Sequence, residues 1–406
     1  MENRPPVTDW AIDFDHFDPQ WTDNPYPIWD TLRQTCPVAT SQRFEDGAYF
    51  ATRYDDVREI AYDAEHFSSR RVIVREHKLP LIPGPPITSD PPEHTPARKL
   101  LLPAFAPREI AKLEDRARAV CRSLLDAIGD KPECDGAVEY AQHIPVRVIA
   151  YMLGMPEEDG DMYRVWIHQT LIEGVRNPAV AIAAMHEQNA YFRKHVELRR
   201  ANPGGDDLVS FLLKAEVDGK PLSEPHILGS LRLILIAGID TTWSGIGASL
   251  WHLATHPQDR ARLVAEPALL PTAIEEFLRA YSPVTMAREV VQEKTLSGCP
   301  FKPGGQVLLS FPAANRDPAK FADADKVLID RAENPHAAFG LGRHRCLGSN
   351  LARMEMTIAI EEWLARFPDF SETPGRKTTW SEGTVRGPRR LPITLRAAGL
   401  KPGPCA

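Results

Sequence analysis

From about residue 96 onward, apolar residues recur every three or four positions, which is the period of a helix with one buried face. In residues 108–129 this face includes Ile110, Ala117 and Leu124, and the run stops at Gly129, a residue type that often ends helices. Residues 202–207 are rich in Gly and Asp and are predicted to form a loop. Similar periodic stretches predict helices at residues 144–153, 160–174, 178–200 and 207–215.

Residues 225–256 form the longest predicted helix, which would span roughly 45 Å at 1.5 Å per residue. Residues 231–237 are apolar on nearly every side, as expected for a helix that passes through the middle of a large domain. Arg232 and Asp240 make the segment a poor membrane span.

The strand signals are shorter and fewer. Apolar runs at residues 48–52, 287–296 and 305–311 are predicted strands, and further helices are expected at residues 271–281 and 347–366. Residues 312–345, which precede the last of these helices, are predicted to be irregular. The predicted fold class is therefore mainly α with a minor β component.

Composition narrows the function classes. The chain has 406 residues, 43% of them hydrophobic, and a formal net charge of −7, which argues against a dedicated nucleic-acid binder. The acidic, Pro-rich N-terminus has no secretory pattern, and no membrane anchor is predicted, so we expect a cytoplasmic protein. The six cysteines include no C-x-x-C pair, which argues against zinc ribbons, iron–sulfur clusters and dithiol redox sites.

The most distinctive segment is residues 339–348, a Gly-rich loop that places Cys346 at the start of a predicted helix. The backbone N–H groups of a helix start and the adjacent Arg343, His344 and Arg345 would favour a thiolate there. From these residues alone, Cys346 is either a ligand-binding thiol or a buried cysteine beside a helix cap.

Residues 237–242 interrupt the long apolar helix with Gly238, Asp240 and Thr241, which are poor helix formers. A Thr hydroxyl can bond to the carbonyl four residues earlier and open the helix locally. By itself the segment fits equally a kink with satisfied polar groups and a niche for a small ligand.

Residues 339–348 resemble the haem-binding loop of the cytochrome P-450 superfamily, Phe-Gly-x-Gly-x-His/Arg-x-Cys-x-Gly, at every fixed position. Residues 237–242, the Glu276-x-x-Arg279 pair and residues 90–98 resemble further motifs of that family in the expected order. The resemblance implies one haem-thiolate monooxygenase domain over residues 1–406, with a long central helix over the haem.

The resemblance also implies roles for individual residues. Cys346 would be the proximal ligand of the iron in haem b, and Asp240 and Thr241 would be catalytic, delivering protons to bound dioxygen. Glu276 and Arg279 would be structural, with Arg331 as a third partner. Further cofactor-binding positions implied in the same way are His94, Arg98, Ala237, Gly238, Arg288, Phe339, Gly340, His344 and Gly348.

The implied activity is an oxidoreductase reaction in which one oxygen atom from O2 enters a small hydrophobic substrate, by C–H hydroxylation or O-demethylation. Electrons would come from NAD(P)H through an external ferredoxin and ferredoxin reductase. Arg108, Lys112, Arg343, Arg345 and Arg353 would form a basic patch that either binds the ferredoxin or consists of ordinary solvated charges. The peroxide-driven and the purely ligand-binding alternatives are both disfavoured by the Asp240–Thr241 pair.

The substrate itself is not identified by the sequence. The expected pocket residues are apolar: Leu81, Ile82, Ile234, Val284, Met286 and Val385. Arg70, Arg71 and Arg75 are interpreted as exposed loop charges rather than as anchors for a substrate carboxylate.

Overall fold

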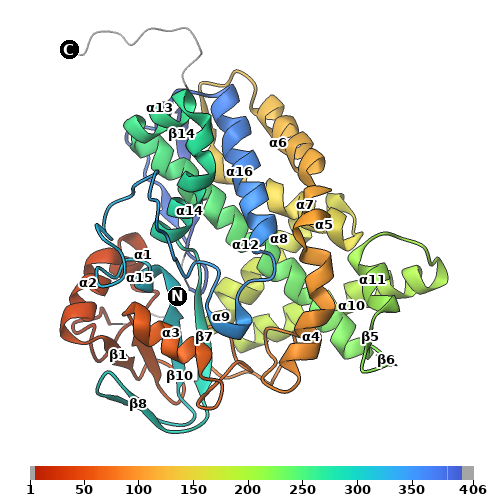
Figure 1. Ribbon diagram of the computed structural model, residues 1–406, viewed down its shortest axis with the longest axis vertical. Helices are drawn as coiled ribbons and strands as arrows, with labels where there is room; N and C mark the ends of the chain where they lie inside the picture. Colours follow the sequence, from red (N-terminus) through yellow and green to blue (C-terminus); the bar gives the residue numbers. More distant parts are fainter. Residues whose placement is uncertain (1–4, 382, 396–406) are drawn as a thin grey trace.

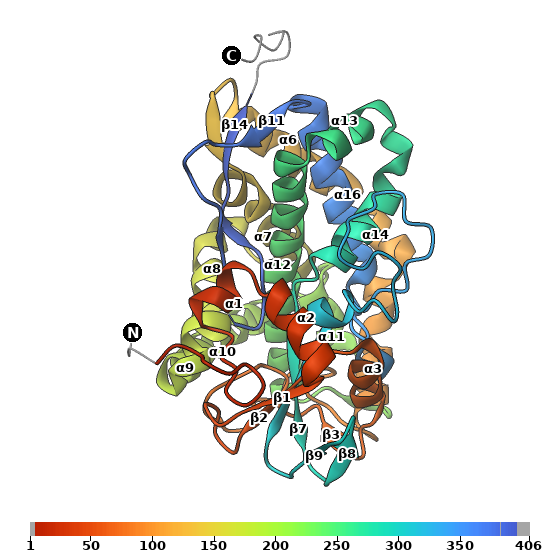
Figure 2. The same cartoon turned by 90° about the vertical axis from the view of Figure 1, so that its left-hand side faces the viewer.

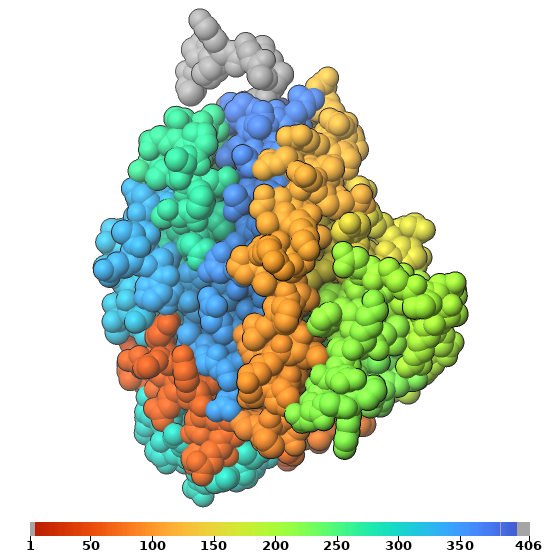
Figure 3. Space-filling model, turned by 45° about the vertical axis from the view of Figure 1, so that its right-hand side comes forward, coloured from red at the N-terminus to blue at the C-terminus, as the bar shows by residue number. Residues whose placement is uncertain are grey.

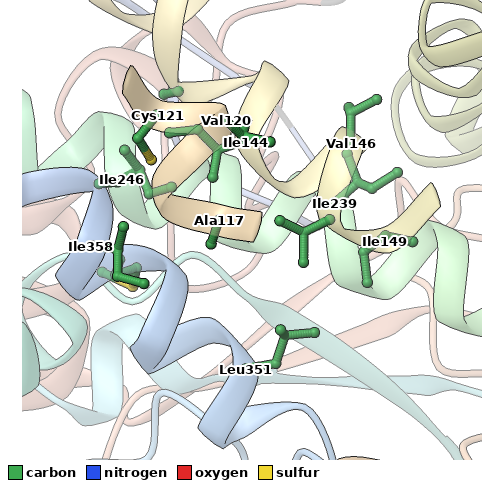
Figure 4. Close-up of a cluster of buried hydrophobic side chains, with 14 of the residues drawn as sticks. Ala117, Val120, Cys121, Ile144, Val146, Ile149, Ile239, Ile246, Leu351 and Ile358 are labelled. Carbon is green, nitrogen blue, oxygen red and sulfur yellow. The ribbon is translucent and has the colours of Figure 1, made fainter. Parts of the chain in front are cut away.

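The central helix α12 (Glu224–Thr255) organises the fold (Figures 1 and 2). A computed structural model describes residues 5–381 and 383–395, and α12 runs through it as one uninterrupted helix. It packs against α7 (His143–Leu153) and α16 (Ser349–Arg366), and α16 packs in turn against α6 (Glu114–Ile128). Ile149, Ile239 and Leu351 meet in this core (Figure 4). The mainly α prediction is confirmed.

Close packing explains the glycine in the middle of α12. A Cβ at Gly238 would lie 2.5 Å from Cδ1 of Ile149 on α7, which is much shorter than a van der Waals contact. A side chain there would push the two helices apart, so packing against α7 is sufficient reason for glycine at this position.

Most predicted helices are present, but two of them are divided. Residues 108–129 form α5 (Pro107–Ala111) and α6, and residues 160–174 form α8 (Gly160–His168), a π-helical turn (Gln169–Glu173) and α9 (Gly174–Arg176). Helices close to their predicted bounds are α10 (Pro178–Ala201), α11 (Leu208–Lys214) and α14 (Leu270–Ala280).

Several short helices are additional to the prediction. Each has ten residues or fewer, so it offers at most about three turns in which a helical period can show. They are α1 (Pro19–Asp23), α2 (Tyr26–Thr35), α3 (Tyr54–Tyr62), α4 (His94–Leu101), α13 (Pro257–Ala265) and α15 (Phe311–Ala314).

A five-stranded sheet lies at one end of the molecule (Figure 2). Its strand order is β1 (Val38–Ser41), β2 (Ala48–Ala51), β10 (Gln306–Ser310), β7 (Thr285–Val290) and β3 (Phe67–Ser68). β2 and β10 are parallel and the other pairs are antiparallel. The sheet therefore joins the N-terminal quarter of the chain to residues 285–310.

A smaller sheet lies near the opposite end, where β14 (Pro392–Leu395) pairs with β11 (Phe370–Glu372) and β4 (Glu133–Asp135). Two-stranded hairpins complete the strands: β5 (Glu216–Val217) with β6 (Lys220–Pro221), β8 (Lys294–Leu296) with β9 (Cys299–Phe301), and β12 (Thr379–Trp380) with β13 (Pro388–Arg390).

Within the described residues, α12 is the one helix long and apolar enough to cross a membrane by length and composition. However, 67% of its most apolar window is buried inside the protein. Figure 2 shows other helices on both sides of it, so its apolar surface is accounted for by the core.

One buried histidine on α12 makes stability depend on pH. Burial lowers the pKa of His252 from 6.5 to about 4, and its ring nitrogens contact the Tyr281 hydroxyl and Asp259 at 2.8 Å each. The unfolded chain therefore binds more protons than the folded protein between pH 6.5 and 4. We expect the free energy of unfolding to fall across this range by about 1 kcal/mol per pH unit.

Urea denaturation at a series of pH values would measure this slope. A His252→Gln variant should show a shallower one, because the group that must take up the proton is gone. An unchanged slope in that variant would mean that other groups control the acid sensitivity.

Candidate active site

A large cavity lies between α12 and the loop that carries Cys346. Its volume is about 360 Å³, within the size range of small-molecule sites, roughly 300–1,000 Å³. Ala237, Gly238 and Thr241 line it from α12, and Phe339, Gly340, Cys346 and Gly348 line it from the facing loop. The structure thus brings both sequence motifs, about a hundred positions apart in the chain, to the lining of one cavity.

Glycines shape the loop of residues 339–348. The Cys346 N–H donates to the Phe339 carbonyl at 2.7 Å, which closes the loop. Gly340 and Gly342 have φ values of 72° and 68°, in the left-handed region that favours glycine. At Gly342 a Cβ would also lie 2.7 Å from the Ala61 carbonyl oxygen, so a side chain has no room.

The Cys346 side chain opens into the cavity rather than into bulk water. Burial raises the pKa of its thiol, and this effect outweighs the lowering by the Gly348 N–H, Arg98 and Arg345. The helix start and the neighbouring cations thus act in the expected direction, but their effect on the pKa is smaller than that of burial. A metal ion bound to the sulfur would supply the missing stabilisation, because coordinated thiols lose their proton.

Three cationic or titratable side chains line the cavity beside the Cys346 loop: Arg98, Arg288 and His344. Arg288 is buried, and burial lowers its pKa to about 10. Burial and the nearby Arg288 lower the pKa of His344 to about 2, so its ring is neutral, and its Nε2 contacts the Ser69 hydroxyl at 2.9 Å. This corner of the cavity suits an anionic group such as carboxylates.

His94 lies behind this corner rather than on the cavity wall. Its ring centroid is 4.4 Å from that of His344, and its Nε2 is buried without a hydrogen-bond partner in the structure. Of the cations predicted to contact the cofactor, Arg98, Arg288 and His344 therefore reach the cavity surface, while His94 supports His344.

The polar residues of α12 face different surroundings. The Thr241 hydroxyl donates to the Ala237 carbonyl at 2.8 Å, as the sequence predicts, but the helix stays continuous there. Thr241 lines the cavity, whereas Asp240 is buried outside its lining and pairs with Arg389 at 2.7 Å. Arg389 was not anticipated, because it lies on β13, 149 residues away, in a segment with no motif.

Five of the six predicted pocket residues line the cavity, and one does not. Ile82, Ile234, Val284, Met286 and Val385 line the cavity, and Val284 and Val385 form an isolated β-bridge across it. The prediction for Leu81 is corrected: it is 53% exposed and lines a separate surface depression. Glu382, beside Val385 in the chain, lies outside the described residues.

The Glu276–Arg279 pair forms a buried hub beneath the site. Both side chains are fully buried and joined by two 2.8 Å hydrogen bonds. Arg331 donates to Glu276 at 2.9 Å, as expected. Arg279 also donates to the carbonyls of Asn315, Ala324 and Lys326. The hub therefore ties α14 to the irregular segment that leads into the Cys346 loop.

The predicted basic patch is less positive than the sequence implies. Arg353 forms a two-point ion pair with Glu275, at 2.5 and 2.8 Å, and packs over the Phe339 ring. Lys112 and Arg108 both contact Glu109. Figure 3 shows the surrounding surface, where α16 (blue) lies beside the segment of α4 to α6 (orange). Arg343 and Arg345 remain candidates for contact with a partner.

These features fit a flat group with a metal centre and anionic substituents. Cys346 offers a sulfur ligand, Ala237 and Gly238 leave space above it, and Arg98 and Arg288 stand where carboxylates need cations. The orphaned Nε2 of His94 and the absence of any acidic side chain among the described lining residues agree with that fit.

Comparisons with known proteins point the same way. The family model described as "Cytochrome P450" matches residues 179–390. Mycinamicin IV hydroxylase/epoxidase of Micromonospora griseorubida is 34% identical, over 89% of this chain and 93% of its own length. Vitamin D(3) 25-hydroxylase of Pseudonocardia autotrophica is 35% identical, over 94% and 96%.

Solved structures agree in fold. CYP109E1 from Bacillus megaterium, in complex with testosterone, has a TM-score of 0.84 and 31% identity, over 92% of this chain and 98% of that one. A mutant of P450 EryK in complex with erythromycin B has a TM-score of 0.84 and 30% identity, over 94% and 99%.

Proposed function

The chain belongs to the cytochrome P450 family, and from this premise we propose that it oxidises a small hydrophobic substrate with electrons from a ferredoxin and its reductase. As a member it is a monooxygenase that uses haem b, O2 and electrons derived from NAD(P)H. The reaction we propose is C–H hydroxylation or O-demethylation in the cytoplasm.

One observation carries the proposal: Cys346, on the loop of residues 339–348, and Thr241, on α12, line the same cavity. The bound haem would supply the iron at which O2 is activated. Cys346 would be a ligand of that iron, and Arg98 and Arg288 would bind the haem carboxylates.

The other residues of the site would position the substrate and move protons. Ile234, Val284 and Val385 offer an apolar wall that excludes water from the reacting carbon. Thr241 presents a hydroxyl beside that space, and Asp240, held by Arg389, lies one residue away on the buried side of α12. We propose that protons reach the cavity through this Asp240–Thr241 pair.

Product formation in three mixtures tests the proposal. The haem-loaded enzyme should oxidise an apolar substrate with NAD(P)H, reductase and ferredoxin, and should do so poorly with hydrogen peroxide alone. Efficient peroxide turnover would favour the peroxide-driven alternative. Substrate binding without product in any mixture would favour a ligand-binding protein.

We predict that Thr241→Ala lowers the product formed per NAD(P)H consumed by about tenfold or more, because a positioned proton donor contributes about 10²- to 10⁴-fold. Electrons would then leave as hydrogen peroxide. Assays of product, peroxide and NAD(P)H in one reaction measure this coupling. Thr255→Ala, at the far end of the same helix, is the matched control. Unchanged coupling in Thr241→Ala would remove Thr241 from the proton path.

A further inference from the structure

Two arginines outside the machinery described above, Arg75 and Arg232, line the same cavity. Arg232 lies on α12, two residues before Ile234, and is 8% exposed. Arg75 lies in the loop between β3 and α4 and is half-buried. The structure thus corrects the interpretation of Arg75 as an exposed loop charge.

The hydrogen-bond partners of Arg232 are neutral. Its guanidinium donates to the Asn189 amide oxygen at 2.5 Å and to the Pro83 carbonyl at 2.6 Å. Burial lowers its pKa. A buried guanidinium held by neutral acceptors keeps an uncompensated positive charge, which is costly in an apolar cavity unless an anion joins it.

The hydrogen-bond partners of Arg75 are neutral as well. It donates to the carbonyls of Gly174 and Thr170, both backbone groups. Burial lowers its pKa to about 10. Thr170 also contacts Gln188 of α10, at 3.3 Å, and Gln188 is the neighbour of the Asn189 that holds Arg232. Arg75 is therefore anchored on the π-helical turn and α9, and Arg232 is anchored on α10 and on the loop at Pro83.

A surface depression leads to Arg75. Val72, Ile73, Arg75, Ile82 and Thr88 line both the depression and the cavity. The other cations of the depression have acidic partners: Arg71 with Glu289, Arg70 with Asp90 and Lys78 with Asp46. Arg75, held by backbone carbonyls, is therefore the cation that the depression shares with the cavity.

We propose that the substrate is an organic carboxylate with an apolar body, and that Arg75 and Arg232 bind its carboxylate group. This inference rests on the proposed function and names its substrate class. The planar guanidinium can donate two parallel hydrogen bonds to a carboxylate. The apolar body then extends along Ile234 and Val284, so that oxidation takes place at the end remote from the carboxylate.

Matched acids and amides provide the test. The haem-loaded protein is titrated by calorimetry and absorption spectroscopy with 4-ethylbenzoate and 4-ethylbenzamide, octanoate and octanamide, and cyclohexanecarboxylate and its amide. At least one acid should bind about tenfold or more tightly than its amide, as expected for hydrogen bonds between charged groups. Arg75→Gln and Arg232→Gln should each reduce that preference severalfold, and Arg75→Lys should retain part of it.

Arg193→Gln is the control, because Arg193 lies on α10 but is paired with Glu224 at 2.8 Å and half-exposed. It removes one positive charge from the helix that holds Asn189, the partner of Arg232, and should keep the preference for acids. The proposal is wrong if no acid binds more tightly than its amide, or if both glutamine variants keep the full preference. If either glutamine variant fails to fold, Arg75→Lys and Arg232→Lys are tested in its place. A full preference for acids over amides in both lysine variants contradicts the proposal, and a weakened preference supports it.

Failure of the proposed function would look different. It would appear in the wild-type protein as missing turnover of the neutral amides and missing red-shifted absorption of the reduced carbon monoxide complex. Calorimetric binding of the acids does not depend on turnover, so the two results are separable.

Discussion

Cys346→Ser is expected to abolish the strongly red-shifted absorption band of the reduced carbon monoxide complex and to reduce product formation to background. With haem bound, the Cys346 thiolate would supply the electron density that favours O–O cleavage, and a serine oxygen would not replace it. The structure adds a second reason: Cys346 is the one cysteine among the described residues that lines the cavity.

Absorption spectra of the reduced protein with carbon monoxide, with and without the substitution, measure the effect directly. Cys121→Ser is a matched control, because Cys121 is buried on α6, far along the chain from the loop, and burial raises its pKa to about 12. That variant should keep the band, with some loss of stability. A normal band in Cys346→Ser would refute the ligand assignment.

Glu276→Gln is expected to lower the free energy of unfolding by about 3–5 kcal/mol, the usual cost of leaving a buried charge without its partner. The carboxylate of Glu276 accepts hydrogen bonds from Arg279, Arg331, Asn334 and the Leu328 N–H. Neutralising it leaves the fully buried Arg279 guanidinium with carbonyl partners and no counter-charge.

Urea denaturation followed by circular dichroism measures this loss, and haem content after purification reports whether the Cys346 loop still forms. Glu224→Gln at the exposed Arg193 pair is the control and should change stability little. A loss as small in Glu276→Gln as in the control would mean that the hub is not essential to the fold.

Local patterns were enough to predict much of the helical framework. The period of apolar residues located α10, α11, α12 and α16 closely, because each buries a face or nearly its whole surface. The division of residues 108–129 into α5 and α6 was missed, since the apolar spacing continues across the break. The short helices before residue 65 were missed because they are at most about three turns long, too short for the apolar spacing to establish a period.

The sequence also predicted those features of the site that depend on residues close together in the chain. Cys346 and its glycines lie in one short loop. Gly340 and Gly342 have left-handed φ values, and the glycine residue type already indicates such a conformation in the sequence. The back-bond from Thr241 to Ala237 spans a single helical turn. Such features follow from local geometry, which sequence fixes residue by residue.

Tertiary structure decided everything that depends on residues distant in the chain. In the folded chain Asp240 pairs with Arg389, and Leu81 is exposed. Arg75, which the sequence alone indicates to be a surface charge, lines the cavity. The net charge of −7 likewise says nothing of Arg75 and Arg232, which line the cavity and are held by neutral groups. The cost of burying a charge depends on the few side chains that surround it, and only the folded chain determines which those are.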